Sequence, residues 1–599
     1  MKLPLALAAP FLRFDFIGAD GRPAPATFTN PVEVIVATRT SDVRDAMRAV
    51  EEGLRRGCHA AGFVSYEAAP GFDDALITHE SGRMPLVWFG LFEHREVETP
   101  WPDESNPTRP AGGRTVASVW RPDVTAQDYR RAVDAVRDAI LDGESYQANY
   151  TFRLRSWVDC AMTEAIYQYL VQEQRAPYSA FLDIGDWQVI SASPELFFRI
   201  DSGVVTTRPM KGTAARGSSP ADDAAQAEWL RSSEKNRAEN VMIVDLARND
   251  VGRIAEVGSV RVSSLFDVER YPSLWQMVST VEGRVRSNAS LTDVFTAMFP
   301  AGSITGAPKA ASMRLIASLE ASPRGVYCGA IGFASPNGPA VFSVGIRTMT
   351  IDTTCGRAEY GAGGGITWDS TADDEHDEAM AKAATLSALP AFELLETLRL
   401  EPGEMVRLDR HLARLRASAL ALGFRCDDAA LRTALLAHAR QWPGARRRVR
   451  LRVSRSGAVT IESAPADQPI LEPVTVALAS EPIARGEPLL VHKTTARGMY
   501  ERHRRSHPDA FDVLLWNENG ELTEFTIGNV VVDLHGERCT PPVSCGLLPG
   551  VFRGALIESG AVRERPIRVA ELESASRIWL VNSVREWVEV RLRLPGGEL

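Results

Sequence analysis

The chain has 599 residues, well beyond the roughly 250–300 residues at which one hydrophobic core stops growing, so two or more domains are expected. Its composition is that of an ordinary globular protein, with 45% hydrophobic and 24% charged residues. A formal net charge of -10 argues against a nucleic-acid partner. No segment reaches the roughly 18 uninterrupted apolar residues of a membrane span.

The N-terminal segment is expected to be a first strand and not a signal peptide. Pro4 and Pro10 interrupt its apolar run, and Arg13 follows closely. Residues 99–114 are dense in Pro, Gly and polar residues, which predicts a linker or long surface loop that sets off an N-terminal segment over 1–115. The seven cysteines are scattered and form no CxxC pair, which is typical of a cytoplasmic protein without a structural zinc site.

The next elements along the chain predict a mixed α/β domain over 116–388 with antiparallel sheets. Apolar residues at helical spacing follow Thr125, and strands flank a turn at Gly185-Asp186. The Asn337-Gly338 pair predicts a hairpin, and a further strand follows a turn at Gly356.

A second unit is expected over 389–599, because Pro390 breaks the preceding helical pattern. It opens with a strand–turn–strand that runs into a helix, and the Asn519-Gly520 pair predicts another hairpin. Residues 446–455 alternate Arg with apolar residues, as a half-exposed strand does.

Polar groups in the first unit suggest a site. Glu195 lies in SASPELFFRI, Lys211 precedes a glycine in TRPMKGTAARG, and Glu375 and Glu378 share one face of a predicted helix. Glu239 is expected to head a second amphipathic helix. Taken singly, such charges are more often those of surface loops and solvated faces. Carboxylates grouped in this way suit Mg²⁺.

Four further segments belong to the same pattern: ESYQANYTF, EKNRAENVMIVDLARNDVGR, FPAGSITGAPK and GAGGGITWDSTADDEHDE. In this order they closely resemble the chorismate-binding enzymes, the family of anthranilate synthase, isochorismate synthase and aminodeoxychorismate synthase component I. The resemblance implies a two-layer α/β fold whose site lies over an antiparallel sheet and holds chorismate through Mg²⁺. It also implies that Glu239 and Glu378 are metal ligands, with Glu375 nearby.

Further residues of the first site follow from the same resemblance. Tyr327 and Arg347, on the two arms of the predicted hairpin, match residues that hold the enolpyruvyl carboxylate. The ring carboxylate and the ring pocket are expected to be contacted by Gly363, Gly364, Gly365 and Thr305, and by Gln276, which replaces a histidine common in relatives.

Lys211 distinguishes among members of the family. The motif PMKGT resembles the PIKGT of aminodeoxychorismate synthases, whereas anthranilate synthases carry alanine in place of the lysine. The resemblance implies attack by Lys211 on C2 of chorismate, with Glu195 as the general acid for the C4 hydroxyl. No glutamine amidotransferase motif is found, so a separate subunit is expected to supply ammonia.

The second unit resembles the class IV pyridoxal-phosphate enzymes, a fold of two subdomains. The resemblance rests on VRLDRHLARL, HKTTARGMYERHRR, LTEFTIGNVVV, GLLPGVFRGALIE and VNSVREWVEV. It implies that Lys493 bonds to the cofactor and that Glu524 pairs with its pyridine nitrogen. The expected phosphate cradle is Arg407, Gly550, Val551, Phe552, Asn582 and Ser583. A homodimer through this unit is possible.

The two resemblances together predict a two-step route to 4-aminobenzoate, a folate precursor. Chorismate is aminated at C4, and the second unit then eliminates pyruvate from the product. An alternative pairs an anthranilate- or isochorismate-type synthase with a D-amino-acid or branched-chain aminotransferase. Another is that one half has decayed into a scaffold, against which the intact Lys211, Glu239, Glu378, Lys493 and Glu524 argue.

Overall fold

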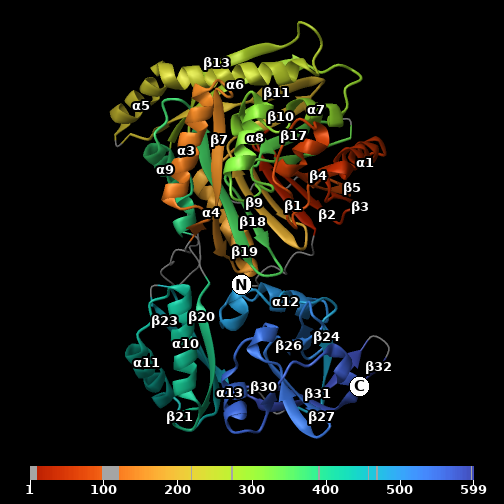
Figure 1. The fold of residues 1–599 in the computed structure, drawn as a ribbon, viewed down its shortest axis with the longest axis vertical. Coiled ribbons are helices and arrows are strands. Elements are labelled where there is room, and N and C mark those ends of the chain that lie inside the picture. The colour runs from red at the N-terminus through yellow and green to blue at the C-terminus, as the bar shows by residue number, and fades with distance from the viewer. Residues whose placement is uncertain are drawn as a thin grey trace.

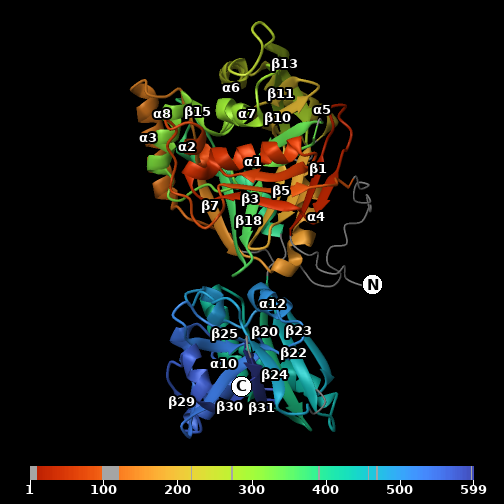
Figure 2. The ribbon, with the colours of Figure 1, turned by 90° about the vertical axis from the view of Figure 1, so that its right-hand side faces the viewer.

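Two halves joined near residue 390 make up the protein in a computed structural model (Figure 1). The structure describes residues 10–96, 120–217, 219–271, 274–336, 338–388, 392–455, 457–466, 470–594 and 597–598. The predicted linker at 99–114 and Pro390 lie outside these residues. The halves stay separate when the molecule is turned by 90° (Figure 2).

The first sheet of the upper half has the strand order β15-β7-β19-β18-β9-β8-β1-β2, with β6 beside β7. Its strands are β1 (Phe11–Phe16), β2 (Ala26–Thr29), β6 (Arg121–Pro122), β7 (Gln147–Trp157), β8 (Tyr178–Asp183), β9 (Trp187–Ser193), β15 (Gly306–Ala307), β18 (Thr348–Asp352) and β19 (Arg357–Ile366). All of these pairings are antiparallel.

The second sheet has the order β12-β14-β11-β10-β17-β16-β4-β5-β3, with β13 beside β14, and is also antiparallel. Its strands are β3 (Glu33–Ala37), β4 (His59–Val64), β5 (Val87–Phe92), β10 (Leu196–Asp201), β11 (Val204–Arg208), β12 (Met210–Ala215), β13 (Arg261–Arg270), β14 (Leu274–Arg284), β16 (Ala330–Ala334) and β17 (Ala340–Val344). The first 96 residues therefore contribute strands to both sheets.

Aromatic rings fill the space between the two sheets. The ring centroids of Phe14 and Phe28, from the first sheet, lie 5.3 and 5.6 Å from that of Phe333 in the second. All three belong to one buried cluster that draws on both sheets. Because aromatic side chains bury large apolar areas, this layer holds the sheets face to face.

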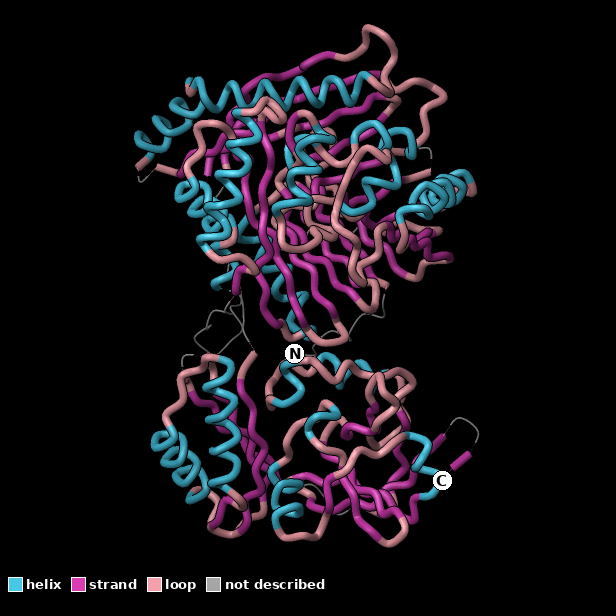
Figure 3. The backbone as a smooth tube through the Cα atoms, viewed as in Figure 1, coloured by secondary structure: helices cyan, strands magenta, loops and turns pink. Residues whose placement is uncertain are grey.

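Helices cover the outer faces of the sheets (Figure 3). The helices of this half are α1 (Val43–Arg55), α2 (Ala69–Phe72), α3 (Ala126–Leu141), α4 (Thr163–Gln174), α5 (Pro220–Ser232), α6 (Glu234–Gly252), α7 (Leu291–Met298), α8 (Lys309–Leu319) and α9 (Ala372–Lys382). Helices α3, α4, α8 and α9 contact the first sheet, whereas α1 and α6 contact the second.

The lower half has two subdomains. The smaller contains the sheet β21-β20-β22-β23 and two helices: β20 (Leu394–Glu401), β21 (Glu404–Met405), β22 (Arg447–Val453), β23 (Val459–Pro465), α10 (Leu408–Leu422) and α11 (Asp428–Arg440). The larger contains β24 (Val474–Leu478), β25 (Val513–Trp516), β26 (Leu522–Phe525), β27 (Gly528–Leu534), β28 (Glu537–Thr540), β29 (Arg563–Glu564), β30 (Ala575–Asn582), β31 (Glu586–Leu594), β32 (Gly597–Glu598), α12 (Gly498–Arg505) and α13 (Val551–Glu558). Only here do parallel pairs occur among the described residues, between β24 and β25, β24 and β31, and β28 and β29.

The expected fold class is confirmed, since the structure mixes helices with mostly antiparallel sheets in both halves. The predicted hairpins are confirmed as well. Strands β8 and β9 pair across Gly185, β16 and β17 across Gly338, and β25 and β26 across Gly520. In β22, the apolar residues are buried in alternation, as predicted.

Two local predictions are wrong. Tyr327 and Arg347 flank the hairpin instead of lying on its arms, because the backbone turns left-handed at Cys328 (φ 62°) and Arg347 (φ 50°), which extended strands do not allow. Glu239 lies inside α6 and not at its start. The Ser233 side chain accepts a hydrogen bond from the Asn236 N–H and starts the helix earlier.

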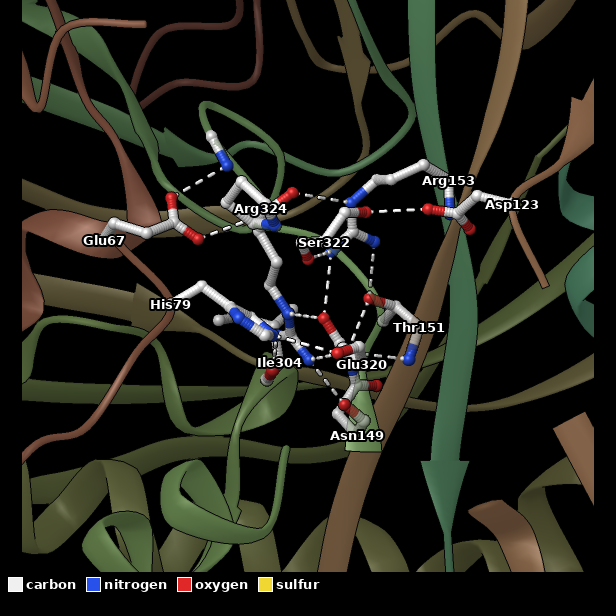
Figure 4. Close-up of polar contacts among 12 residues, drawn as sticks. Glu67, His79, Asp123, Asn149, Thr151, Arg153, Ile304, Glu320, Ser322 and Arg324 are labelled. Carbon is white, nitrogen blue, oxygen red and sulfur yellow. Dashed lines mark hydrogen bonds and ion pairs between the residues drawn. The ribbon is translucent and has the colours of Figure 1, made fainter. Parts of the chain in front are cut away.

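A buried charge network ties several loops to the first sheet (Figure 4). Glu320, just after α8, lies 2.9 Å from Arg153 of β7 and 2.6 Å from Arg324. Arg324 in turn donates to the backbone oxygens of Ile304 and Asn149, at 2.7 and 2.6 Å. Burial alone raises the pKa of Glu320, but the two guanidiniums outweigh it and hold that pKa below its ordinary value.

We predict that Glu320→Ala destabilises the first half by about 3–5 kcal/mol, because two buried guanidinium groups lose their counter-charge. The matched control is Asp245→Ala, which removes an exposed ion pair with Arg248 and should cost about 0–1 kcal/mol. Denaturant unfolding followed by circular dichroism measures both. Equal unfolding free energies for the two variants would contradict the assigned role of the network.

Candidate active sites

Lys211 stands at the start of β12, among carboxylates from distant parts of the chain. Its electrostatic neighbours include Glu195, Glu239 of α6 and Glu378 of α9. Burial is the largest influence on the amine and lowers its pKa, although the carboxylates oppose the effect. A lowered pKa increases the share of neutral, nucleophilic amine at neutral pH.

Glu195 is buried next to this lysine. Ser303 Oγ donates to its Oε1 at 2.6 Å, and the Met210 N–H also donates to the carboxylate. Burial raises the pKa of Glu195 to about 7. A carboxyl group with that pKa is partly protonated near neutral pH and suits general acid catalysis.

A small cavity of about 20 Å³ lies behind Glu195 and is also lined by Ser303 and Asp250. This volume exceeds the roughly 10–15 Å³ that one water molecule requires. The polar lining offers a water the hydrogen-bond partners that it needs, so Glu195 has room beside it for a proton-exchange partner.

The three predicted metal ligands approach one another. Glu378 is an electrostatic neighbour of both Glu239 and Glu375, and burial raises the pKa of these last two. Glu378 also lies 2.9 Å from Lys382 Nζ. Among the described residues, no group of three or more His, Cys, Asp or Glu side chains is arranged as a ready metal site. The set fits Mg²⁺, which usually combines a few carboxylates with water and substrate oxygens.

The glycines of β19 allow side chains to approach the backbone. A β-carbon on Gly365 would lie 2.5 Å from Lys211 Nζ, and one on Gly364 would lie 3.1 Å from Glu375 Oε2. The carbonyl oxygen of Gly363 accepts from Lys382 Nζ at 3.0 Å. A side chain at 365 would therefore displace the amine of Lys211.

The other predicted substrate residues already have partners. Gln276 Nε2 donates to the Gly212 carbonyl at 2.8 Å, beside Lys211, and Thr305 Oγ1 donates to the Ala301 carbonyl at 3.1 Å. Arg347 donates to Gln174 Oε1 at 3.2 Å, and the Tyr327 ring lies against Gly361. Through these hydrogen bonds, Gln276 and Thr305 hold the backbone at Gly212 and Ala301.

Sequence reasoning missed three side chains of this site: Gln147, Ser303 and Lys382. Lys382 follows Glu378 by four residues, the spacing at which oppositely charged side chains meet on a helix. Ser303 and Gln147 carry no such local signal, because their partners are far away in the sequence.

Lys493 lies between the two subdomains of the lower half. Its carbonyl oxygen accepts from the Leu395 N–H of β20 at 2.9 Å. Burial, reinforced by Arg414 and Arg497, lowers the pKa of Lys493 to about 7. The lysine is therefore poised to react as a neutral amine.

Glu524 on β26 is the carboxylate predicted to pair with the cofactor. It accepts from Tyr500 Oη at 2.7 Å and from the Leu548 N–H at 3.2 Å, and Asn529 Nδ2 lies 3.3 Å from its second oxygen. Burial raises the pKa of Glu524 to about 7. Tyr500 and Asn529 were not predicted as site residues.

The Arg407 side chain contacts Glu586 and Phe552. Its guanidinium lies 2.6 Å from Glu586 and 4.5 Å above the ring of Phe552. Arg414, which sequence reasoning passed over, is an electrostatic neighbour of Lys493 and donates to the Pro549 carbonyl at 3.1 Å. Arg414 therefore acts directly on the charge of Lys493.

The remaining cradle residues lie at turns. Gly550 immediately precedes Val551 at the start of α13, and a β-carbon on it would meet Asn529 Oδ1 at 1.9 Å. Asn582 Oδ1 accepts from the N–H groups of two residues after it, and Ser583 is buried. A lysine, a buried carboxylate and a glycine-lined helix start fit pyridoxal phosphate, so Lys493, Glu524 and Gly550 would hold it.

A cavity of about 520 Å³ reaches Lys493, Arg497, Tyr500 and Leu548. This falls in the roughly 300–1,000 Å³ range of small-molecule sites. Its wall also includes residues of the upper half: Arg83, Asp186, Thr354 and Cys355.

In the parts of the chain that the structure describes, every helix is too short or too polar to cross a membrane.

The two halves match known proteins separately. Residues 19–388 match the sequence profile of the chorismate binding enzyme family, and residues 393–592 match that of amino-transferase class IV. Over 270 residues the chain is 44% identical to an aminodeoxychorismate synthase of Streptomyces griseus, covering 45% of this chain and 36% of that protein. Over 267 residues it is 41% identical to aminodeoxychorismate synthase component 1 of Salmonella typhimurium, covering 45% of this chain and 58% of that one.

The chain thus matches less than two thirds of the length of these curated relatives. Its fold is similar to the crystal structure of anthranilate synthase component I from Streptococcus pneumoniae, with 26% identity and a TM-score of 0.52, covering 65% of this chain and 94% of that one. The chain therefore belongs to the chorismate binding enzyme family, with a class IV aminotransferase domain following in the same chain.

Proposed function

We propose that this chain makes 4-aminobenzoate from chorismate in two steps, with one step in each half. The observation that carries the proposal is Lys211, a lysine of lowered pKa that lies near the buried general acid Glu195. Similarity to aminodeoxychorismate synthases supports amination at C4. The class IV half supports pyruvate elimination as the second step, because that reaction uses the product of the first.

In the first half, the neutral amine of Lys211 attacks C2 of chorismate while Glu195 gives its proton to the departing C4 hydroxyl, which leaves as water. Ammonia then bonds to C4, and the C2–nitrogen bond breaks to return the lysine amine. The net change replaces the hydroxyl with an amine and releases one water. Glu239, Glu375 and Glu378 would hold Mg²⁺, whose charge offsets that of the ring carboxylate.

In the second half, bound pyridoxal phosphate acts as an electron sink that stabilises negative charge next to the substrate amine. Lys493 takes the proton from ring C4, and the bond between ring C3 and the enolpyruvyl oxygen breaks as the ring becomes aromatic. The enolpyruvate that leaves takes up a proton to become pyruvate. Glu524 is held by Tyr500 and Asn529 and orients the cofactor ring. Burial, together with the positive side chains Arg414 and Arg497, lowers the pKa of the lysine and favours its neutral form.

We predict that Lys211→Ala abolishes efficient ammonium-dependent amination of chorismate, because the covalent step is lost. A decrease of at least about 10²-fold is expected on the scale of a single lost catalytic group. Product chromatography with chorismate, ammonium and Mg²⁺ measures it. Arg48→Ala, which removes an exposed side chain of α1 paired with Asp45, is the control. Near-normal 4-aminobenzoate formation by Lys211→Ala would refute the nucleophile, whereas anthranilate from the unmodified chain would point to an anthranilate-type synthase.

We propose that the nitrogen comes from a separate amidotransferase subunit. The prediction is that ammonium supports product formation by the pure chain and that glutamine alone gives little. Addition of a glutamine amidotransferase partner should restore the use of glutamine. Equal rates with glutamine and ammonium in the pure chain would show that the chain hydrolyses glutamine itself.

The two proposed sites lie toward opposite ends of β19. Arg357, at its start, lies 3.0 Å from Glu487 of the lower half, whereas Gly365 faces Lys211. At roughly 3.3 Å per residue, these two positions are about 26 Å apart. We propose that the intermediate leaves the first site and reaches the second through solvent.

We predict that a mixture of Lys211→Ala and Lys493→Ala chains makes 4-aminobenzoate, although neither variant does so alone. Lys493→Ala should accumulate aminodeoxychorismate and lose the visible absorbance of lysine-bound pyridoxal phosphate, while Lys211→Ala retains that absorbance. Product formation by Lys493→Ala alone would refute the lyase assignment. A mixture that stays inactive, while Lys211→Ala converts supplied aminodeoxychorismate, would refute transfer through solvent.

A further inference from the structure

The side chain of Gln147 is a buried amide that takes no part in the two proposed reactions. It opens β7, with 1% of its surface exposed. Among the described residues, neither its Nε2 nor its Oε1 has a hydrogen-bond partner. A buried amide that bonds to nothing costs free energy, so its retention in this place calls for a reason.

The backbone of Gln147 is fixed firmly. Its carbonyl oxygen accepts from Ser145 Oγ at 3.0 Å and from Ser312 Oγ at 3.1 Å. Gln147 also pairs with Ala307 of β15, directly after the loop that carries Ser303 and Thr305. These contacts fix the backbone from which the buried amide extends.

The amide meets Lys211 in the space that Gly365 leaves open. Gln147 Nε2 lies 2.1 Å and Lys211 Nζ 2.5 Å from the point where a β-carbon on Gly365 would stand. Both nitrogens are hydrogen donors, and two donors that face each other make no bond. Rotation of the amide by half a turn puts Oε1 in the place of Nε2, and the two orientations are nearly indistinguishable by shape.

We propose that Gln147 is a positioning residue for Lys211: its amide oxygen accepts a hydrogen from the amine in the gap at Gly365 and turns the nitrogen lone pair toward the substrate. A neutral amine has two N–H groups and one lone pair, so holding an N–H fixes where the lone pair points. A neutral acceptor does this without the charge by which a carboxylate would keep the amine protonated.

This inference rests on the proposed role of Lys211 as the nucleophile. It makes the first sheet part of the amination machinery, because β7 supplies the amide and β19 supplies the gap. It also gives a second reason for glycine at 365, since a side chain there would displace the amide as well as the lysine.

The test is Gln147→Leu in the full chain, which removes both polar atoms and shortens the side chain by one atom. We expect kcat for ammonium-dependent amination to fall by roughly 10²-fold, the cost of a misplaced reacting group, with little change in KM for chorismate. Gln188→Leu is the matched control: Gln188 is a buried glutamine of the same sheet, and its Nε2 bonds to Asp183 at 2.7 Å. Pyruvate elimination from supplied aminodeoxychorismate should stay normal in both variants.

A second variant guards against misfolding. Gln147→Asn keeps the amide but shortens it by one methylene, so it should also lose kcat. Selective acylation of Lys211, followed by peptide mass spectrometry, should change in rate in both Gln147 variants and not in Gln188→Leu. Unchanged kcat in either Gln147 variant, while Lys211→Ala is inactive, would overturn the inference alone. Activity in Lys211→Ala would overturn the proposed function with it.

Discussion

The buried ion network around Glu320 is the constraint on which the upper site depends. One carboxylate is shared by Arg153 and Arg324, and the latter reaches the backbone oxygens of Ile304 and Asn149. Such charges are tolerated in a protein interior only when they are paired and fully hydrogen-bonded. The network therefore fixes β7 against the loop before Thr305, and Gln147 and Ser303 take their places on those two segments.

In the lower half, the proposed site is positioned by the junction of two subdomains and not by a buried charge network. The backbone of Lys493 is hydrogen-bonded to β20 of the small subdomain. Glu524, which acts electrostatically on this lysine, belongs to the large subdomain. Burial shifts the pKa of both groups to about 7, from opposite directions. The cavity of about 520 Å³ that reaches Lys493 leaves room for a cofactor together with a substrate.

The way the halves meet bears on how the two proposed reactions are linked. The upper half contributes Asp186 and Thr354 to the wall of the lower cavity, so the second site opens toward the first half. The lysine of the first site nevertheless lies toward the far end of β19. In Figure 1, α6, which carries Glu239, runs along the edge of the upper half away from the lower half. Fusion of the halves thus keeps the two proposed activities together at equal numbers.

The sequence by itself determined the α/β class and the hairpins at Gly185 and Gly520, and it supplied the residues proposed for both sites, because turns and motifs are local signals. It could not place Glu239 within its helix, since a cap at Ser233 decided that boundary. Only the tertiary structure set Gln147 beside Lys211 and Arg414 beside Lys493. These pairs come from strands and helices far apart in the chain, and burial and charge act through space, which no spacing along the sequence records.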